Sequence, residues 1–189
     1  MGPLDNWPMS CKSPWFLAPM AAALLACSPA LNWREARIDG MALRVLLPCK
    51  PDRAEREVAM GGRSLPLRML GCDADGATFA VSHVRAAAAD GTEAAVLLAG
   101  WKAAVLAHVR GDAVVEQPWS PGPALAAAGP ALRVRAQGHG ADGAAVAMQA
   151  VWFAVTDAAG LHLLHAVVFA PQARPEAAET FFSSFVPAP

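Results

Sequence analysis

The sequence predicts an α+β domain in which a mostly antiparallel sheet of about seven to eight strands is flanked by helices. Tight-turn pairs separate the apolar runs of the first half, at Asp39-Gly40, Gly61-Gly62 and Asp75-Gly76, and this spacing is typical of consecutive β-hairpins. An alanine-rich segment follows, and alanine has the highest helix propensity. Three more strands and a second helix complete an order that favours one layered domain, over residues 32–187.

Five strands are expected before the first helix. They are Trp33 to Ile38, Met41 to Leu47, Arg56 to Met60, Arg63 to Cys72 and Thr78 to Val84. The second strand alternates most clearly, because Leu43, Val45 and Leu47 share one face while Arg44 lies on the other. This alternation predicts that one face of the first hairpin packs on a core.

The first helix is expected from Thr92, as its N-cap, to about Val109. Apolar residues recur at helical spacing within it and predict a stripe that packs against the sheet. The stripe consists of Leu98, Trp101, Val105 and His108. His108 is therefore expected to be partly buried and hydrogen-bonded.

The second half begins with a proline-rich loop, expected from Glu116 to Pro130, because proline cannot continue a helix or join a sheet interior. Three strands follow, at Leu132 to Gln137, Ala144 to Thr156 and Leu161 to Phe169. Both faces of the last two strands are apolar, so helices are expected to cover the sheet on both sides. The closing helix has Pro175 in its first turn and an apolar face made of Ala178, Phe181, Phe182 and Phe185.

Residues 1–26 are predicted to be a secretory signal peptide. The purely apolar stretch from Trp15 to Ala26 is 12 residues long, and as a helix it reaches about 18 Å against a hydrocarbon core of ~30 Å. It is too short to cross a membrane. Lys12 precedes it and small residues follow, which is the three-part layout of a secretory signal. A start at Met9 gives a more ordinary beginning, so residues 1–8 are interpreted as an artefact of the gene start.

The run Leu24-Leu25-Ala26-Cys27 resembles the lipobox of bacterial lipoproteins. The resemblance implies that Cys27 carries diacylglycerol and palmitate and becomes the new amino terminus, with residues 27–31 as a lipid-anchored tether. Ser28 then implies sorting to the outer membrane of a Gram-negative bacterium, facing the periplasm, and several acyl chains make such attachment stable. The alternatives are a soluble periplasmic protein, cleaved at Ser28-Pro29-Ala30, and a retained anchor.

The remaining cysteines, Cys49 and Cys72, are predicted to form a disulfide. If Gly61-Gly62 is a tight turn, opposed residues in its hairpin sum to 123 and Cys72 falls opposite Pro51, two residues from Cys49. That is within reach of a bridge if the chain bends at Pro48 and Pro51. Two reduced buried cysteines and a metal pair are the alternatives, although no Cys-x-x-Cys or neighbouring histidine completes a metal site.

The mature chain resembles the PsbP-like α/β/α sandwich group, which includes many uncharacterised bacterial exported proteins. The resemblance rests on the Trp33 strand, Leu46-Leu47-Pro48, the mid-chain helix and the closing run from Glu179 to Phe185, and it covers about 155 residues. It implies a binding or assembly-assisting role without a shared catalytic site. A fold resemblance by itself does not establish function.

No catalytic residue, metal site or cofactor is expected. His162 and His165, three positions apart on a strand, should point to opposite faces. His83 and His139 have no carboxylate or cysteine near them in the pattern, and no serine lies in a Gly-x-Ser-x-Gly or Ser-x-x-Lys motif. A net charge of −1, from 15 Lys+Arg and 16 Asp+Glu, argues against a nucleic-acid partner.

Three residues are the candidates for a partner surface. Arg133 and Arg135 share one face of a strand and could line an anionic groove, with Arg44 and Arg68 as candidates for the same side of the sheet. Trp119 heads the long proline-stiffened loop and could be presented to an envelope protein or lipid. An arginine rim in solvent and a loop lying on the sheet are the alternatives. The sequence thus predicts a non-catalytic envelope lipoprotein, with a carrier of an apolar ligand between sheet and helix, or an envelope-acting enzyme, as alternatives.

Overall fold

The computed structural model describes residues 30–86, 91–125, 127–157 and 159–188, and within them the chain forms two antiparallel sheets and two helices. The large sheet has the strand order β3-β4-β5-β9-β8-β7-β6. Its strands are β3 (Asp52–Met60), β4 (Arg63–Ala74), β5 (Ala77–Ala86), β6 (Asp112–Pro118), β7 (Leu132–His139), β8 (Ala145–Asp157) and β9 (Gly160–Ala170). The small sheet contains β1 (Arg34–Arg37), β2 (Leu43–Leu47) and β10 (Val186–Pro187), and the helices are α1 (Gly91–His108) and α2 (Pro175–Phe182). The predicted α+β class with a mostly antiparallel sheet is confirmed.

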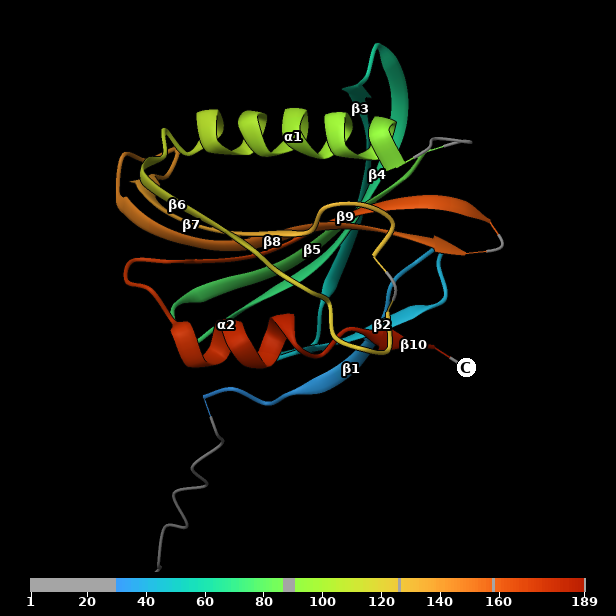
Figure 1. Cartoon of the computed structure of the whole chain (residues 1–189). Coiled ribbons are helices and arrows are strands. Elements are labelled where there is room, and N and C mark those ends of the chain that lie inside the picture. The colour runs from blue at the N-terminus through green and yellow to red at the C-terminus, as the bar shows by residue number, and fades with distance from the viewer. Residues whose placement is uncertain (1–29, 87–90, 126, 158, 189) are drawn as a thin grey trace, which may run out of the picture.

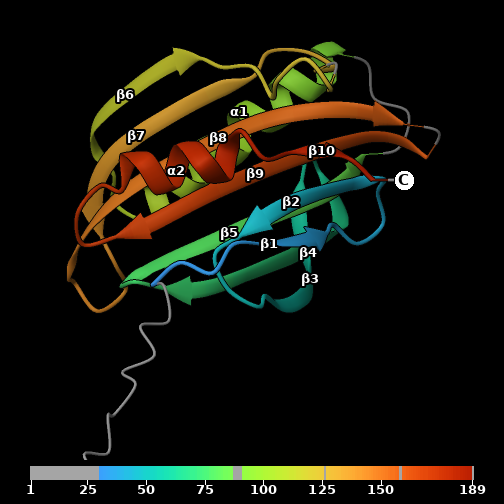
Figure 2. The ribbon, with the colours of Figure 1, turned by 90° about the horizontal axis from the view of Figure 1, so that it is seen from below.

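The large sheet is covered on both faces. Helix α1 lies across one face, and α2 lies with the small sheet against the opposite face (Figures 1 and 2). Residues of β8 and β9 are consequently buried on both sides, as their sequence predicts. The predicted cover by helices alone is wrong, because the small sheet β1-β2-β10 lies beside α2 on this face (Figure 2).

The first two strands are not part of the large sheet, although a single sheet was expected from the sequence. The hairpin of β1 and β2 is paired from Arg34↔Leu47 to Arg37↔Arg44, and one of its faces is apolar while the other is half-exposed. A two-stranded ribbon with one apolar face buries that face by packing flat on another sheet. If the ribbon extended the edge of the large sheet instead, one of its sides would be exposed to water. Pairing of Val186 with Arg44 adds β10 as a third strand, which the sequence did not predict.

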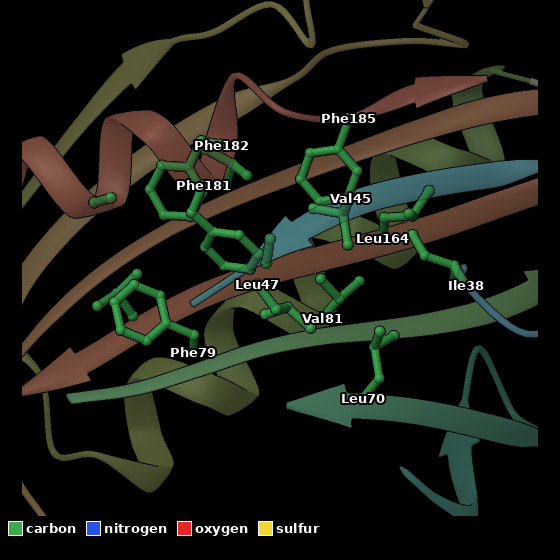
Figure 3. Packing of buried hydrophobic residues seen from close by; sticks show 14 of the residues in the cluster. Ile38, Val45, Leu47, Leu70, Phe79, Val81, Leu164, Phe181, Phe182 and Phe185 are labelled. Carbon is green, nitrogen blue, oxygen red and sulfur yellow. The ribbon is translucent and has the colours of Figure 1, made fainter. Parts of the chain in front are cut away.

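Aromatic rings fill the space between the large sheet, α2 and the small sheet (Figure 3). Phe181 of α2 contacts Phe79 of β5 edge-on at 5.8 Å, and Phe185 contacts Phe153 of β8 at 5.1 Å. Helix α2 forms because proline is favoured at its start and because Ala178, Phe181 and Phe182 share the buried face. The predicted apolar face is confirmed for these three residues, whereas Phe185 is buried but lies after the end of the helix.

Helix α1 packs on the other face through Leu97, Leu98 and the half-buried Trp101, against a sheet surface that includes Trp152 and Leu163. Two details differ from the sequence prediction. The helix already includes Gly91, so Thr92 lies inside its first turn and is not the N-cap. His108 is exposed, because Val109 turns inward at the helix end and takes the buried position.

The proline-rich loop starts later than predicted, since Glu116 to Pro118 pair with β7 as the end of β6. This strand is at the edge of the sheet, where proline loses no ladder hydrogen bond on the open side. A register shift between Asp112 and Val115, with Ala113 at a φ of 46°, bulges the strand. Bulged edges resist pairing with other chains.

The hairpin around Gly61-Gly62 has the predicted register, with Met60 opposite Arg63. Both glycines have positive φ angles, of 59° and 74°, which suits a tight hairpin turn. Beyond the hairpin, Cys49 and Cys72 are joined by a disulfide with Cα atoms 6.0 Å apart. The predicted pairing is confirmed, and the bridge ties the segment after β2 to β4.

Candidate functional site

A hollow of about 480 Å³ lies where α2 begins, between that helix and the end of the large sheet. We call it the tether-side hollow, because it is lined by Leu31, the last residue of the predicted tether, and by Trp33. Its walls come from the segment before β1, the β4–β5 turn and the start of α2. The lining residues are Leu31, Trp33, Ala74, Asp75, Ala77, Phe79, Ala173, Arg174, Pro175, Glu176, Ala177 and Thr180.

The wall of the tether-side hollow is apolar at Trp33 and Phe79, whose rings meet edge-on at 5.9 Å. The rim is polar. Arg174 is ion-paired with Asp75, with Nη1 2.9 Å from Oδ2, and it also donates from Nη2 to the Asp75 carbonyl oxygen at 2.7 Å. Glu176 adds a second carboxylate, so the rim does not favour an anion. This arrangement suits a small ligand with an apolar body and a neutral or basic polar group.

A chain of buried polar side chains lies at the other end of the molecule, on the same face of the large sheet. His83 Nε2 of β5 is 2.8 Å from His162 Nδ1 of β9, and His162 Nε2 is 2.7 Å from Asp157 Oδ1. His83 is 1% exposed and His162 is fully buried, whereas 27% of the Asp157 side chain is exposed. We call these three residues the histidine relay.

The proton positions in the histidine relay follow from the acceptor at its outer end. An ionised Asp157 only accepts, so His162 donates from Nε2 and accepts at Nδ1, and His83 donates from Nε2. Nδ1 of neutral His83 is then a buried lone pair, and no hydrogen-bond partner reaches it among the described residues. Burial, the neighbouring His162 and the charge of Arg68 lower the pKa of His83 to about 4.

Asp157 holds the charged end of the relay. Partial burial would raise its pKa, but hydrogen bonds from His162 and from the Ala159 N–H outweigh burial, so the pKa lies below its usual value. Asp157 also lines a second hollow, of about 560 Å³, beside the turn from Asp39 to Ala42. We call this the turn-side hollow.

His165 lies on the α1 face, opposite His162, as the strand spacing predicts. Its ring stacks on Trp152 with centroids 4.3 Å apart and meets Trp101 edge-on at 5.6 Å. Complete burial lowers its pKa to about 3, so it is a neutral packing residue. The two histidines share no metal, and no cluster of three metal-ligating side chains occurs in the part of the chain that the structure describes.

The residues predicted for a partner surface do not form one exposed patch. Trp119 is half-buried against Phe153, with ring centroids 5.3 Å apart. Arg133 is ion-paired with Glu179 at 2.6 Å and lies over the ring of Phe182, so it joins the sheet to α2. Arg135 is exposed on the same face of β7, as predicted. Arg44 lies in the small sheet, so it does not share a side of the large sheet with Arg68.

The histidine relay was not predicted from the sequence, because no partner residue for His83 is recognisable in the sequence pattern. The predicted signal peptide, Cys27 and the rest of the predicted tether up to residue 29 lie outside the described residues. No helix in the described ranges is long and apolar enough to cross a membrane. The chain is an α+β fold of two antiparallel sheets and two helices that carries two surface hollows. No protein-family model and no curated protein matches the chain.

Proposed function

We propose that the chain is a non-catalytic lipoprotein of the bacterial cell envelope, anchored to the outer membrane through Cys27, that binds a ligand or an envelope partner in the periplasm. The observation that supports binding best is the tether-side hollow, because Leu31, the last residue of the predicted tether, and Trp33 form part of its wall. The Cys49–Cys72 disulfide is consistent with export to an oxidising compartment. A soluble periplasmic form is the alternative location, and membership of the PsbP-like group is part of the same proposal.

Binding is favoured over catalysis by the burial of the histidine relay. General acid–base groups have to reach the substrate within hydrogen-bond distance. His83 and His162 are 1% and 0% exposed, so neither ring reaches a molecule in either hollow. An envelope-acting enzyme is therefore the least supported of the three functions.

Membrane attachment is tested by the mass of the chain purified from the membrane fraction of a Gram-negative host. We expect a chain that starts at Cys27 with diacylglycerol and an acyl group, and two cysteines that are alkylated only after reduction. The variant Cys27→Ser should move the protein to the soluble fraction. A soluble wild-type product that starts near Leu31, or an uncleaved chain with reduced cysteines, would contradict the lipoprotein proposal.

A second candidate function, a carrier of an apolar ligand, is favoured by the position of the tether-side hollow between Phe79 of the sheet and Ala177 of α2. Its volume of about 480 Å³ is in the range of small-molecule sites, roughly 300–1,000 Å³. We expect saturable binding of the fluorescent apolar probe 1-N-phenylnaphthylamine. Thr180→Trp, which fills the hollow from its exposed rim, should weaken that binding by about tenfold or more.

The matched control is Ala99→Trp, which adds the same side chain to the exposed face of α1, away from the hollow. Its probe affinity should equal that of the wild type. Equal binding by Thr180→Trp, or no saturable binding by the wild type, would count against the carrier function. Neither result would bear on the lipid anchor.

A further inference from the structure

The turn from Asp39 to Ala42, between β1 and β2, covers the histidine relay. Gly40 has a φ of 80°, and a Cβ atom there would lie 2.6 Å from Nη1 of Arg68 and 3.9 Å from Cε1 of His83. The backbone of the turn therefore lies directly on the guanidinium and close to the imidazole. His83 is shielded from water by this contact, and no larger residue fits at Gly40 without displacing Arg68.

Ion pairs and hydrogen bonds hold the turn in place. Asp39 is 2.6 Å from Arg53 at the start of β3, and Arg68 is paired with Glu55 at 2.9 Å. The backbone of Ala42 hydrogen-bonds Asp157, and its carbonyl accepts from the Ala188 N–H at 2.9 Å. The turn is thus attached to the relay at its charged end and covers it at the other end.

The relay accommodates only a limited number of protons in this geometry. A proton on Nδ1 of His83 would face the backbone at Asp39, which favours it, but it would also lie beside the cation of Arg68. The contact between Nε2 of His83 and Nδ1 of His162 is 2.8 Å long and has room for a single hydrogen, so one nitrogen donates and the other accepts. Arg85, the strand partner of His162, is a further cation on this face.

We propose that the Asp39–Ala42 turn is an acid-released latch, which neutral His83 keeps closed and which lifts from the large sheet when His83 takes up a proton. Lifting extends the turn-side hollow from Asp157 to His83 and brings His83 into contact with water. The large sheet stays folded in this step. This inference does not depend on the lipoprotein proposal, because every contact that carries it lies within the domain.

The direction of the pH dependence follows from the pKa of His83, which is about 4 when the turn is closed and near 6.5 when the ring is in water. The open form therefore binds more protons, and opening is favoured as the pH falls from 6.5 towards 4. The opening equilibrium should increase by up to about tenfold per pH unit for each proton taken up. Asp157 adds to this effect only at lower pH, below its usual pKa of 3.8, because its pKa is lowered in the closed form.

The test is amide hydrogen exchange on the full mature domain between pH 7 and 5, corrected for intrinsic rates. Protection of amides in residues 36–45 should fall by about tenfold or more, while the central amides of β8 and β9 keep theirs. His83→Gln, which does not titrate, should remove this pH dependence. His139→Gln, at an exposed position on β7, is the matched control and should behave as the wild type.

An equal loss of protection across the large sheet, or an unchanged pH dependence in His83→Gln, would overturn the latch. If His83→Gln does not fold, the wild type is titrated by NMR. The turn amides and the ring of His83 should then shift with one common midpoint below 6. Turn amides that do not follow His83 would equally overturn the proposal.

Discussion

Replacing Phe181 by alanine is expected to lower the free energy of unfolding by about 3–5 kcal/mol, the usual range for a buried phenylalanine. Phe181 is fully buried, and its ring contacts Phe79, Phe182 and Phe185 at centroid distances of 5.8, 5.4 and 6.2 Å. These neighbours belong to β5, α2 and the segment before β10, so none of them can move into the cavity without shifting a whole element. Urea unfolding followed by circular dichroism measures the loss.

Ser183→Ala provides the control for this prediction. Ser183 is exposed at the end of α2, and its hydroxyl donates only to backbone oxygens of the same helix. Surface changes of this kind usually alter stability by less than about 0.5 kcal/mol. If Phe181→Ala lowers the free energy of unfolding by less than about 2 kcal/mol, the packing of α2 against the two sheets does not stabilise the domain as expected.

Local features of the fold were predictable because short-range patterns determine them. Gly61-Gly62 fixes the register of one hairpin, and that register in turn places Cys72 within reach of Cys49. The helical spacing of Leu98, Trp101 and Val105 indicates the buried face of α1 in the same way, although His108 at its end is exposed, and the phenylalanines indicate that of α2.

The division into two sheets was not predictable, because it depends on which surface the β1–β2 ribbon covers. Alternation in Leu43, Val45 and Leu47 shows that one face is buried, but it does not say whether the ribbon lies on a sheet or continues its edge. The short strand β10 was not predicted for a related reason: Val186, near the far end of the sequence, pairs with β2.

The histidine relay depends on long-range strand order. His83 and His162 become neighbours because β9 lies next to β5, although they are 79 residues apart in sequence. Only the contact of His162 with Asp157 has a local signal, as the two residues are separated by a single tight hairpin. The position of Trp119 was not predictable either. An aromatic residue in a proline-rich loop has the same sequence pattern whether it contacts a partner or packs on Phe153.

Removal of the disulfide, in the double variant Cys49→Ser/Cys72→Ser, is expected to lower the free energy of unfolding by about 3 kcal/mol. The bridge closes a loop over a sequence separation of 23 residues, and the unfolded chain gains entropy when this loop is opened. Urea unfolding of the oxidised protein and of the double variant gives the difference directly. A loss of less than about 1 kcal/mol would contradict the prediction.

The position of the bridge gives this variant a second consequence. Cys49 follows the end of β2 at Leu47, whereas the Asp39–Ala42 turn is at the opposite end of the same hairpin. The disulfide therefore fixes the end about which the hairpin would swing when the latch opens. Without it, both ends of the hairpin should exchange faster at pH 7, and the protection of residues 36–45 should already be reduced before any histidine is protonated. Normal protection at pH 7 in the double variant would show that the relay alone holds the hairpin.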